Sequence, residues 1–228
     1  MSATEDEKIK NVHFEEIGAS PFLKPIRMHF ERIHGDQSKK MMWDLSVEHD
    51  SVACIIFHRQ NNVLLFVKQF RPPVFVRRVR ALPENVGKPL NEIKFGDYPL
   101  SIGMTIELCA GLMDKAMHSP LQTIQEEILE ECGYKVPENN IKLIKQLVSN
   151  VSISGSRQHL FYTEIDESMK ETEGGGNLCE GEFIEKVFLS IDEAKRYINE
   201  PSVDSPPGLL FGITWFLNQL EKNDLPML

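Results

Sequence analysis

Apolar and polar residues alternate in one early stretch of the chain and form continuous apolar runs in several later ones. The alternation between Arg27 and Val47 is typical of half-buried strands. Two apolar runs, 51–57 and 61–67, are separated by a short polar link and predict a hairpin in a buried sheet. Further strands are predicted at 104–111, 141–148, 159–164 and 185–189.

A serine and a proline mark the start of the first predicted helix. Ser119 suits the N-cap, Pro120 suits the first helical position, and Gly133 follows the expected end. A short amphipathic helix is predicted at 191–198 and a longer apolar one at 208–220. These elements follow no regular βαβ rhythm, so we expect a mixed sheet with helices on its faces, which is an α/β fold.

The length of 228 residues suits one domain with an added arm. Residues 1–24 are polar, and we expect a flexible N-terminal segment there. The domain then covers 25–228, and its first part, about 25–48, is expected to form a β arm. The segment 76–100 contains arginines and prolines without periodicity, which suggests a surface excursion.

The charge balance excludes some classes of partner. The chain has 34 acidic against 25 basic residues and a formal net charge of −9, whereas nucleic-acid and anionic-membrane binders need a basic surface. The four cysteines form no CxxC pair, so we expect reduced thiols. The charged start of the chain does not resemble a signal peptide, and no apolar run reaches the roughly 18 residues of a membrane span. We therefore expect a cytoplasmic protein with neither a nucleic-acid nor a membrane partner.

Acidic residues cluster on the helix that is expected to begin near Pro120. Glu127, Glu130 and Glu131 project from one side of it, and Glu126 adds a fourth carboxylate. Like charges at this spacing cost about 0.2–0.5 kcal/mol per pair, near the negative end of the helix dipole. A cation would relieve that repulsion, and oxygen ligands suit Mg²⁺ or Mn²⁺. The alternative is a solvated acidic face.

The segment 111–134 resembles the Nudix box, in which a Gly and a Glu precede Arg-Glu-aliphatic-x-Glu-Glu-x-Gly-aliphatic. Its second half matches from Glu127 to Gly133, and Tyr134 occupies the last, usually aliphatic, position. Other stretches resemble the ADP-ribose and nucleotide-sugar pyrophosphatase branch of this family: KQFRP at 68–72, ELCAGLMD at 107–114 and EGEFIE at 180–185. The resemblance implies a Nudix-type α/β/α sandwich that hydrolyses a nucleoside diphosphate sugar with Mg²⁺, or alternatively Mn²⁺.

The resemblance also implies roles for individual residues. The metal ligands would be the carbonyl of Ala110 and the carboxylates of Glu127, Glu130, Glu131 and Glu182. The catalytic residues would be Glu127, Glu131 and Glu180, with Glu180 as the base or as the residue that orients the attacking water. The candidates for substrate contact are Arg71, Arg80, Gln69 and Trp43. The Arg71 guanidinium could bind a phosphate through its planar fork, or equally hold a structural carboxylate.

Two positions depart from the Nudix box. Glu126 stands where the family has an arginine, and His118 occupies the early glutamate position, with one extra residue between it and Gly111. Since both members of this pair differ, one hypothesis is that the pair has exchanged polarity. The alternative is that an extra carboxylate beside the metals weakens catalysis.

Three functions stay open on the sequence alone. Hydrolysis of UDP-glucose is our first expectation and hydrolysis of ADP-ribose the second, a preference that rests on the resemblance. The third is a nucleotide-binding protein with the same fold and little catalysis, favoured by Glu126. Homodimers are common in this branch, so we expect a homodimer.

Overall fold

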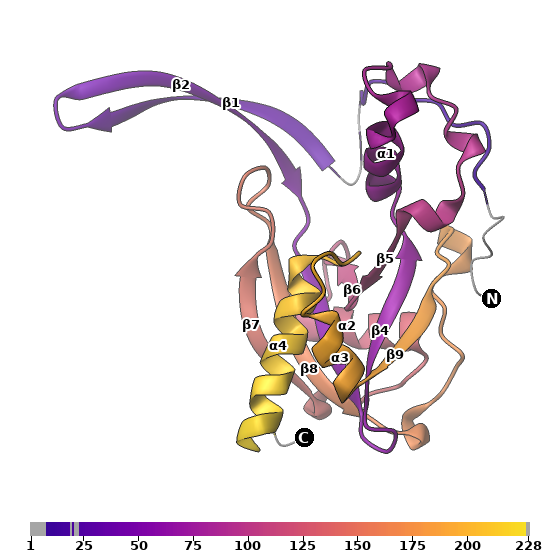
Figure 1. The fold of residues 1–228 in the computed structure, drawn as a ribbon. Helices are drawn as coiled ribbons and strands as arrows, with labels where there is room; N and C mark the ends of the chain where they lie inside the picture. The colour runs from indigo at the N-terminus through magenta and orange to yellow at the C-terminus, as the bar shows by residue number, and fades with distance from the viewer. Residues whose placement is uncertain (1–7, 19, 21–22, 227–228) are drawn as a thin grey trace.

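A two-stranded ribbon extends away from the body of the protein in the computed structural model, which describes residues 8–18, 20 and 23–226 (Figure 1). The ribbon pairs β1 (Leu23–His34) with antiparallel β2 (Gln37–Glu48). An ion pair joins opposite strands, with Arg27 Nε 2.6 Å from Asp44 Oδ1. This ribbon is the β arm that the alternating sequence predicts, two residues longer at its start.

The body is built on a seven-stranded mixed sheet. The order is β5-β4-β3-β8-β7, while β6 also pairs with β3 and β9 with β4. β3 and β8 are parallel, and the other pairs are antiparallel. The strands are β3 (Ser51–His58), β4 (Val63–Phe70), β5 (Met104–Glu107), β6 (Cys109–Leu112), β7 (Ile141–Val148), β8 (Arg157–Ile165) and β9 (Glu185–Ser190).

Helices cover both faces of this sheet. Alternate residues of β3 point to opposite sides: Val52 and Ile56 join one buried cluster, and Ala53 and Ile55 join another. The first cluster includes residues of α2 (Pro120–Glu127), and the second includes residues of α3 (Ile191–Tyr197) and α4 (Pro207–Lys222). Figure 1 shows α3 and α4 together on one side of the sheet. The predicted α/β/α sandwich is confirmed.

The expectation for residues 76–100 is wrong in part. Pro72 to Ala81 form helix α1, and short 3₁₀ turns follow it. Phe75, Val79, Ile93 and Phe95 are buried together, so the segment builds a small core of its own. Pro72 and Pro73 look like breakers in the sequence, but proline is accepted in the first turn of a helix, whose N–H groups have no partner inside the helix.

Part of the N-terminal segment packs on this small core. The ring of Phe14 packs at a tilt against that of Phe95, with ring centroids 5.2 Å apart, and Ile9 lies against the same cluster. The Phe14 N–H also donates to Asn91 Oδ1 at 2.9 Å. Residues 1–7, 19, 21 and 22 lie outside the described part, so the expected flexibility of 1–24 stays a prediction there.

The four cysteines are free thiols, three of them buried, and Cys179 exposed. None of the helices in the described part of the chain combines the length and the apolarity that a membrane span requires.

Candidate active site

The acidic helix begins and ends where the sequence predicts. Ser119 and Gln122 form a capping box, in which Gln122 N–H donates to Ser119 Oγ at 3.2 Å and Ser119 N–H donates to Gln122 Oε1 at 3.0 Å. Gly133 ends it at φ +86°, a conformation that favours glycine. The last turn, Ile128–Cys132, widens into a π-helix, a feature frequent at functional sites. This turn holds Glu130 and Glu131.

Glu131 points into the protein toward strand β6. Its side chain is buried, at 3% exposure. The N–H of Ala110 donates to Glu131 Oε2 at 3.1 Å, and the Cys109 thiol also hydrogen-bonds the carboxylate. Helix and strand are therefore joined through the carboxylate. The contact uses the amide of Ala110, so the carbonyl of Ala110 as a metal ligand stays a prediction.

Glu127 lies directly over Gly111. A Cβ atom added at Gly111 would come within 1.9 Å of Glu127 Oε1 and 2.7 Å of its Cγ. Any side chain at position 111 would displace the Glu127 carboxylate. Gly111 therefore leaves open the space that the Glu127 carboxylate occupies.

Burial makes these two carboxylates unusually basic. The pKa of Glu127 is raised from 4.5 to about 7, first by burial and then by the negative charges of Glu130 and Glu182. The pKa of Glu131 is raised to about 8, again chiefly by burial, although the Cys109 thiol and the Ala110 amide lower it. The charges of Glu127 and Glu182 raise it further.

These properties suit a divalent cation. A cation beside Glu127 and Glu131 would take the place of the protons that burial and like charge favour. Among the described residues, no three acidic, histidine or cysteine side chains already stand together as a complete ligand set. Glu182 is exposed in the EGEFIE stretch at 180–185, here called the late acidic loop. The side chain of Glu180 lies outside the described residues.

A pH titration of stability tests this electrostatic account. The folded protein keeps protons on Glu127 and Glu131 between about pH 4.5 and 8 that the unfolded chain releases, so the free energy of unfolding falls as pH rises through this window. We expect the metal-free melting temperature to fall in the same direction, and Mg²⁺ to raise it more at about pH 8 than at about pH 5. Glu131→Gln should flatten the profile. An equal Mg²⁺ effect at both pH values would contradict the account.

Arg71 holds a carboxylate. Its Nε lies 2.8 Å from Glu107 Oε1 and its NH2 2.7 Å from Oε2, which is a bidentate pair, and Thr105 Oγ1 donates to Oε1 at 2.6 Å. The guanidinium charge lowers the pKa of Glu107 against the opposing effect of burial. The sequence leaves Arg71 open to binding a phosphate or holding a structural carboxylate, and the described contacts are those of the second role. Its side chain is still 44% exposed, which leaves room for a phosphate.

Two adjoining clefts flank this ion pair and share Glu107 and Pro206. One, of about 370 Å³, lies between Ala110 and the start of α4, and the other, of about 290 Å³, is lined by Arg71 and Arg78. Arg78 also donates to Ile102 O at 2.8 Å.

The remaining substrate candidates occupy different places. Gln69 lies half-buried on β4 opposite Thr105. Arg80 is exposed on α1 and lines neither cleft. Trp43 is 51% exposed on the arm, where its indole N–H donates to Ser152 O at 3.1 Å. Contact of these three residues with substrate stays a prediction.

Sequence reasoning missed Glu107 and Gln158 as cleft residues. Glu107 begins the ELCAGLMD stretch, and Gln158 ends the stretch SGSRQ at 154–158, which also resembles the family, so a signal was present for both. Arg78 belongs to a run of arginines that the sequence offers either as phosphate contacts or as a solvated group, and the course of α1 places it at the cleft.

Comparison with curated proteins finds relatives over nearly the whole chain. The uridine diphosphate glucose pyrophosphatase NUDT14 of Bos taurus is 35% identical over 216 residues, which are 93% of this chain and 96% of that protein. Its namesake from Mus musculus is 32% identical over 222 residues, or 94% and 96% of the two chains. The chain belongs to the Nudix hydrolases. It is an enzyme of the kind that cleaves pyrophosphate bonds.

A bacterial branch of the same family matches a shorter part. The GDP-mannose pyrophosphatase of Pectobacterium atrosepticum is 32% identical over 151 residues, covering 66% of this chain and 64% of that protein. No protein-family model matches the chain. Nudix pyrophosphatases generally depend on divalent metal ions.

The two departures from the Nudix box lie next to each other. His118 Nδ1 is 3.3 Å from Glu126 Oε2, although without a well-oriented hydrogen bond. Lys115 Nζ is closer, at 2.7 Å, and chiefly its hydrogen bond lowers the pKa of Glu126. Glu126 therefore pairs with basic groups, an arrangement that the exchanged-polarity hypothesis requires. Because this pairing turns Glu126 toward Lys115 and His118, an extra carboxylate here is compatible with a working Nudix site.

Proposed function

We propose that this chain hydrolyses a nucleoside diphosphate sugar to a nucleoside monophosphate and a sugar 1-phosphate, with UDP-glucose as the preferred substrate. The supporting observation is the hydrogen bond of Glu131 to Ala110 and the position of Glu127 over Gly111, both on strand β6, in a chain whose relatives at 35% and 32% identity are named uridine diphosphate glucose pyrophosphatase. A second candidate is GDP-mannose, after the bacterial relative.

The metal ligands in this proposal are Glu127, Glu130, Glu131, Glu182 and the carbonyl of Ala110. These groups would hold Mg²⁺, or Mn²⁺ in its place, and the cation would supply positive charge to the non-bridging oxygens of the pyrophosphate. The chain's own contribution is to hold two basic carboxylates in place before substrate arrives. Glu131 is held by hydrogen bonds from Ala110 and Cys109. Glu127 occupies the space that Gly111 leaves open.

Two further roles complete the proposed reaction. Glu180 takes a proton from the attacking water or orients it, which is the role that its position in the late acidic loop implies. Arg71 is fixed in direction by its bidentate pair with Glu107 and keeps N–H donors for a phosphate oxygen. The clefts beside Glu107 provide the space for the rest of the nucleotide sugar.

A substrate panel tests the proposal. Release of UMP and glucose 1-phosphate from UDP-glucose with Mg²⁺ is measured beside ADP-ribose and GDP-mannose. We expect the highest kcat/KM with UDP-glucose. A higher kcat/KM with ADP-ribose or GDP-mannose would replace the preferred substrate, and no turnover with any of them would favour a nucleotide-binding protein.

We also propose a homodimer formed through the arm. Opposite residues of the ribbon share a face, so one face is apolar, and half of its side chains are exposed in the single chain while the others are half-buried. Its residues are Ile26, Met28, Phe30, Met41, Trp43 and Leu45. A second copy would bury this face. Light scattering of the purified protein measures the mass directly.

We further infer a cytoplasmic location, since free thiols persist in reducing compartments.

A further inference from the structure

The end of the acidic helix is held by a segment from far along the sequence. A helix leaves its last carbonyls without partners inside the helix. Here Glu130 O accepts from Gly176 N–H at 3.1 Å, and Glu131 O accepts from Gly175 N–H at 2.9 Å. Two glycines therefore bind the carbonyls of two residues that are proposed metal ligands.

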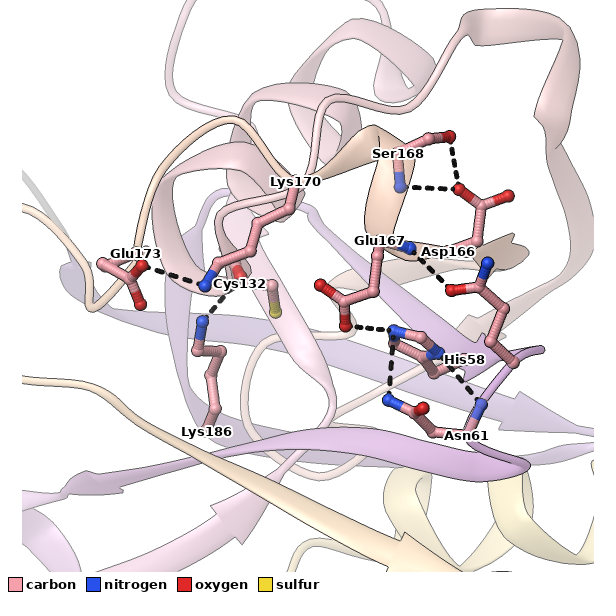
Figure 2. Close-up of polar contacts among 10 residues, drawn as sticks. His58, Asn61, Cys132, Asp166, Glu167, Ser168, Lys170, Glu173 and Lys186 are labelled. Atoms are coloured by element: carbon pink, nitrogen blue, oxygen red, sulfur yellow. Dashed lines mark hydrogen bonds and ion pairs between the residues drawn. The ribbon is translucent and has the colours of Figure 1, made fainter.

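The next two carbonyls, those of Cys132 and Gly133, also accept hydrogen bonds. Cys132 O accepts from Lys186 Nζ at 3.3 Å, as Figure 2 shows. Gly133 O accepts from the N–H groups of Glu171 and Thr172 at 2.9 and 3.1 Å. Residues 171–176, here called the strap, thus hold three of these four carbonyls, and Lys186 holds the fourth. An ion pair of 2.9 Å between Lys170 and Glu173 lies at its start (Figure 2).

The strap can approach the helix this closely because it lacks side chains there. A Cβ atom added at Gly174, whose φ is +65°, would lie 2.5 Å from Glu131 O. One added at Gly133 would lie 2.3 Å from Thr172 O. Both contacts are with backbone atoms, which cannot swing aside. The glycines at 174–176 suggest a mobile loop in the sequence, but in the structure Gly174 and Gly176 permit close packing, and Gly175 and Gly176 donate N–H groups to the helix.

The other end of the strap leads into the late acidic loop. Ile184 N–H donates to Gly175 O at 2.9 Å, which ties the strap to the start of β9. A Cβ atom added at Gly176 would lie 3.0 Å from the Cβ of Glu182. Glu182 is also the residue whose charge acts on both Glu127 and Glu131. The strap therefore contacts the helix on one side and the backbone of the acidic loop on the other.

We propose that the strap is a positioning element for the metal site: Gly174, Gly175 and Gly176 set the distance between the helix carboxylates and Glu182. The inference rests on the proposed function, since it takes these carboxylates as metal ligands. None of the strap glycines touches metal or substrate in this proposal. They act through the backbone of Glu130 and Glu131 and through the position of Glu182.

The test compares two alanine variants of the full chain. Gly174→Ala adds a Cβ against the helix backbone, whereas Gly87→Ala adds one at a similar φ, +81°, with no atom within 4 Å. Both substitutions introduce the same kind of backbone strain, so their difference isolates the contact with the helix. The readout is the affinity for Mn²⁺ without substrate, measured by calorimetry, together with kcat and KM for UDP-glucose.

We expect Gly174→Ala to bind Mn²⁺ at least about tenfold more weakly, and Gly87→Ala to stay within about twofold of the wild type. Excess Mn²⁺ should restore part of the kcat of Gly174→Ala, with KM for UDP-glucose little changed. Equal Mn²⁺ affinities of the two variants would overturn the inference. If the wild type hydrolyses no nucleotide sugar but Gly174→Ala still weakens Mn²⁺ binding, the proposed function is wrong, whereas the positioning role of the strap is supported.

A second variant and a second measurement cover the case in which Gly174→Ala does not fold. Lys186→Met keeps the aliphatic stem but removes the donor to Cys132 O, and should weaken Mn²⁺ binding about threefold. In the metal-free wild type, the amide protons of Gly175 and Gly176 should exchange much more slowly than that of Gly87. Exchange of all three at the same rate would overturn the inference.

Discussion

Replacement of Glu131 by glutamine is expected to lower the turnover of UDP-glucose by roughly 100-fold or more. Glutamine has nearly the same shape and can still accept the Ala110 amide at the position where Glu131 Oε2 now lies. It has no negative charge, so a divalent cation loses one of its most buried ligands. The fold should persist, because burying a neutral amide in this place costs less than burying a carboxylate.

The measurement is the release of glucose 1-phosphate at saturating Mg²⁺, beside a far-ultraviolet circular dichroism spectrum and a melting curve. Glu221→Gln makes the same chemical change on an exposed residue of α4 and should leave turnover within about twofold. Wild-type turnover in Glu131→Gln would show that the acidic helix is not the metal site. That result would favour the alternative of a solvated acidic face.

Alanine at position 111 should be nearly as damaging, although it adds only a methyl group. Its Cβ would overlap Glu127 Oε1 at 1.9 Å, so the carboxylate must rotate away from strand β6. Rotation removes a proposed ligand without changing any charge of the protein. We expect turnover and Mn²⁺ affinity to fall together, each by about tenfold to 100-fold.

Gly18→Ala is the matched control, because no atom lies within 4 Å of a Cβ there and the backbone is not left-handed. Thermal melting separates the effect on the site from a loss of the fold. If Gly111→Ala kept both turnover and Mn²⁺ affinity, Glu127 could not be a ligand in the position that the structure describes.

Local signals in the sequence predicted the acidic helix well. Its start depends on Ser119 and Pro120 and its end on Gly133, and each acts within a few residues of its own position. The arm is predicted for a similar reason, since alternation over a long stretch specifies a strand without reference to the rest of the chain.

Long-range contacts could not be predicted in the same way. The pair of Arg71 with Glu107 depends on the antiparallel register of β4 and β5, and one residue of shift would turn either side chain to the other face. The glycines at 174–176 show the same limit. The sequence identifies residues with unusual backbone freedom, but only the fold shows that Gly174 uses this freedom to approach the helix at Glu131.

The parallel pairing of β3 with β8 has a consequence for how the chain folds. Ser51 and Gln158 are neighbours in this pairing but lie 107 positions apart in the sequence. During synthesis, the apolar strand β3 therefore emerges long before its neighbour β8. Until β8 arrives, one edge of β3 is open to pairing with another chain, and closing so long a loop is slow. The strand at the centre of the finished sheet is thus the segment most exposed to misassembly while the protein is being made.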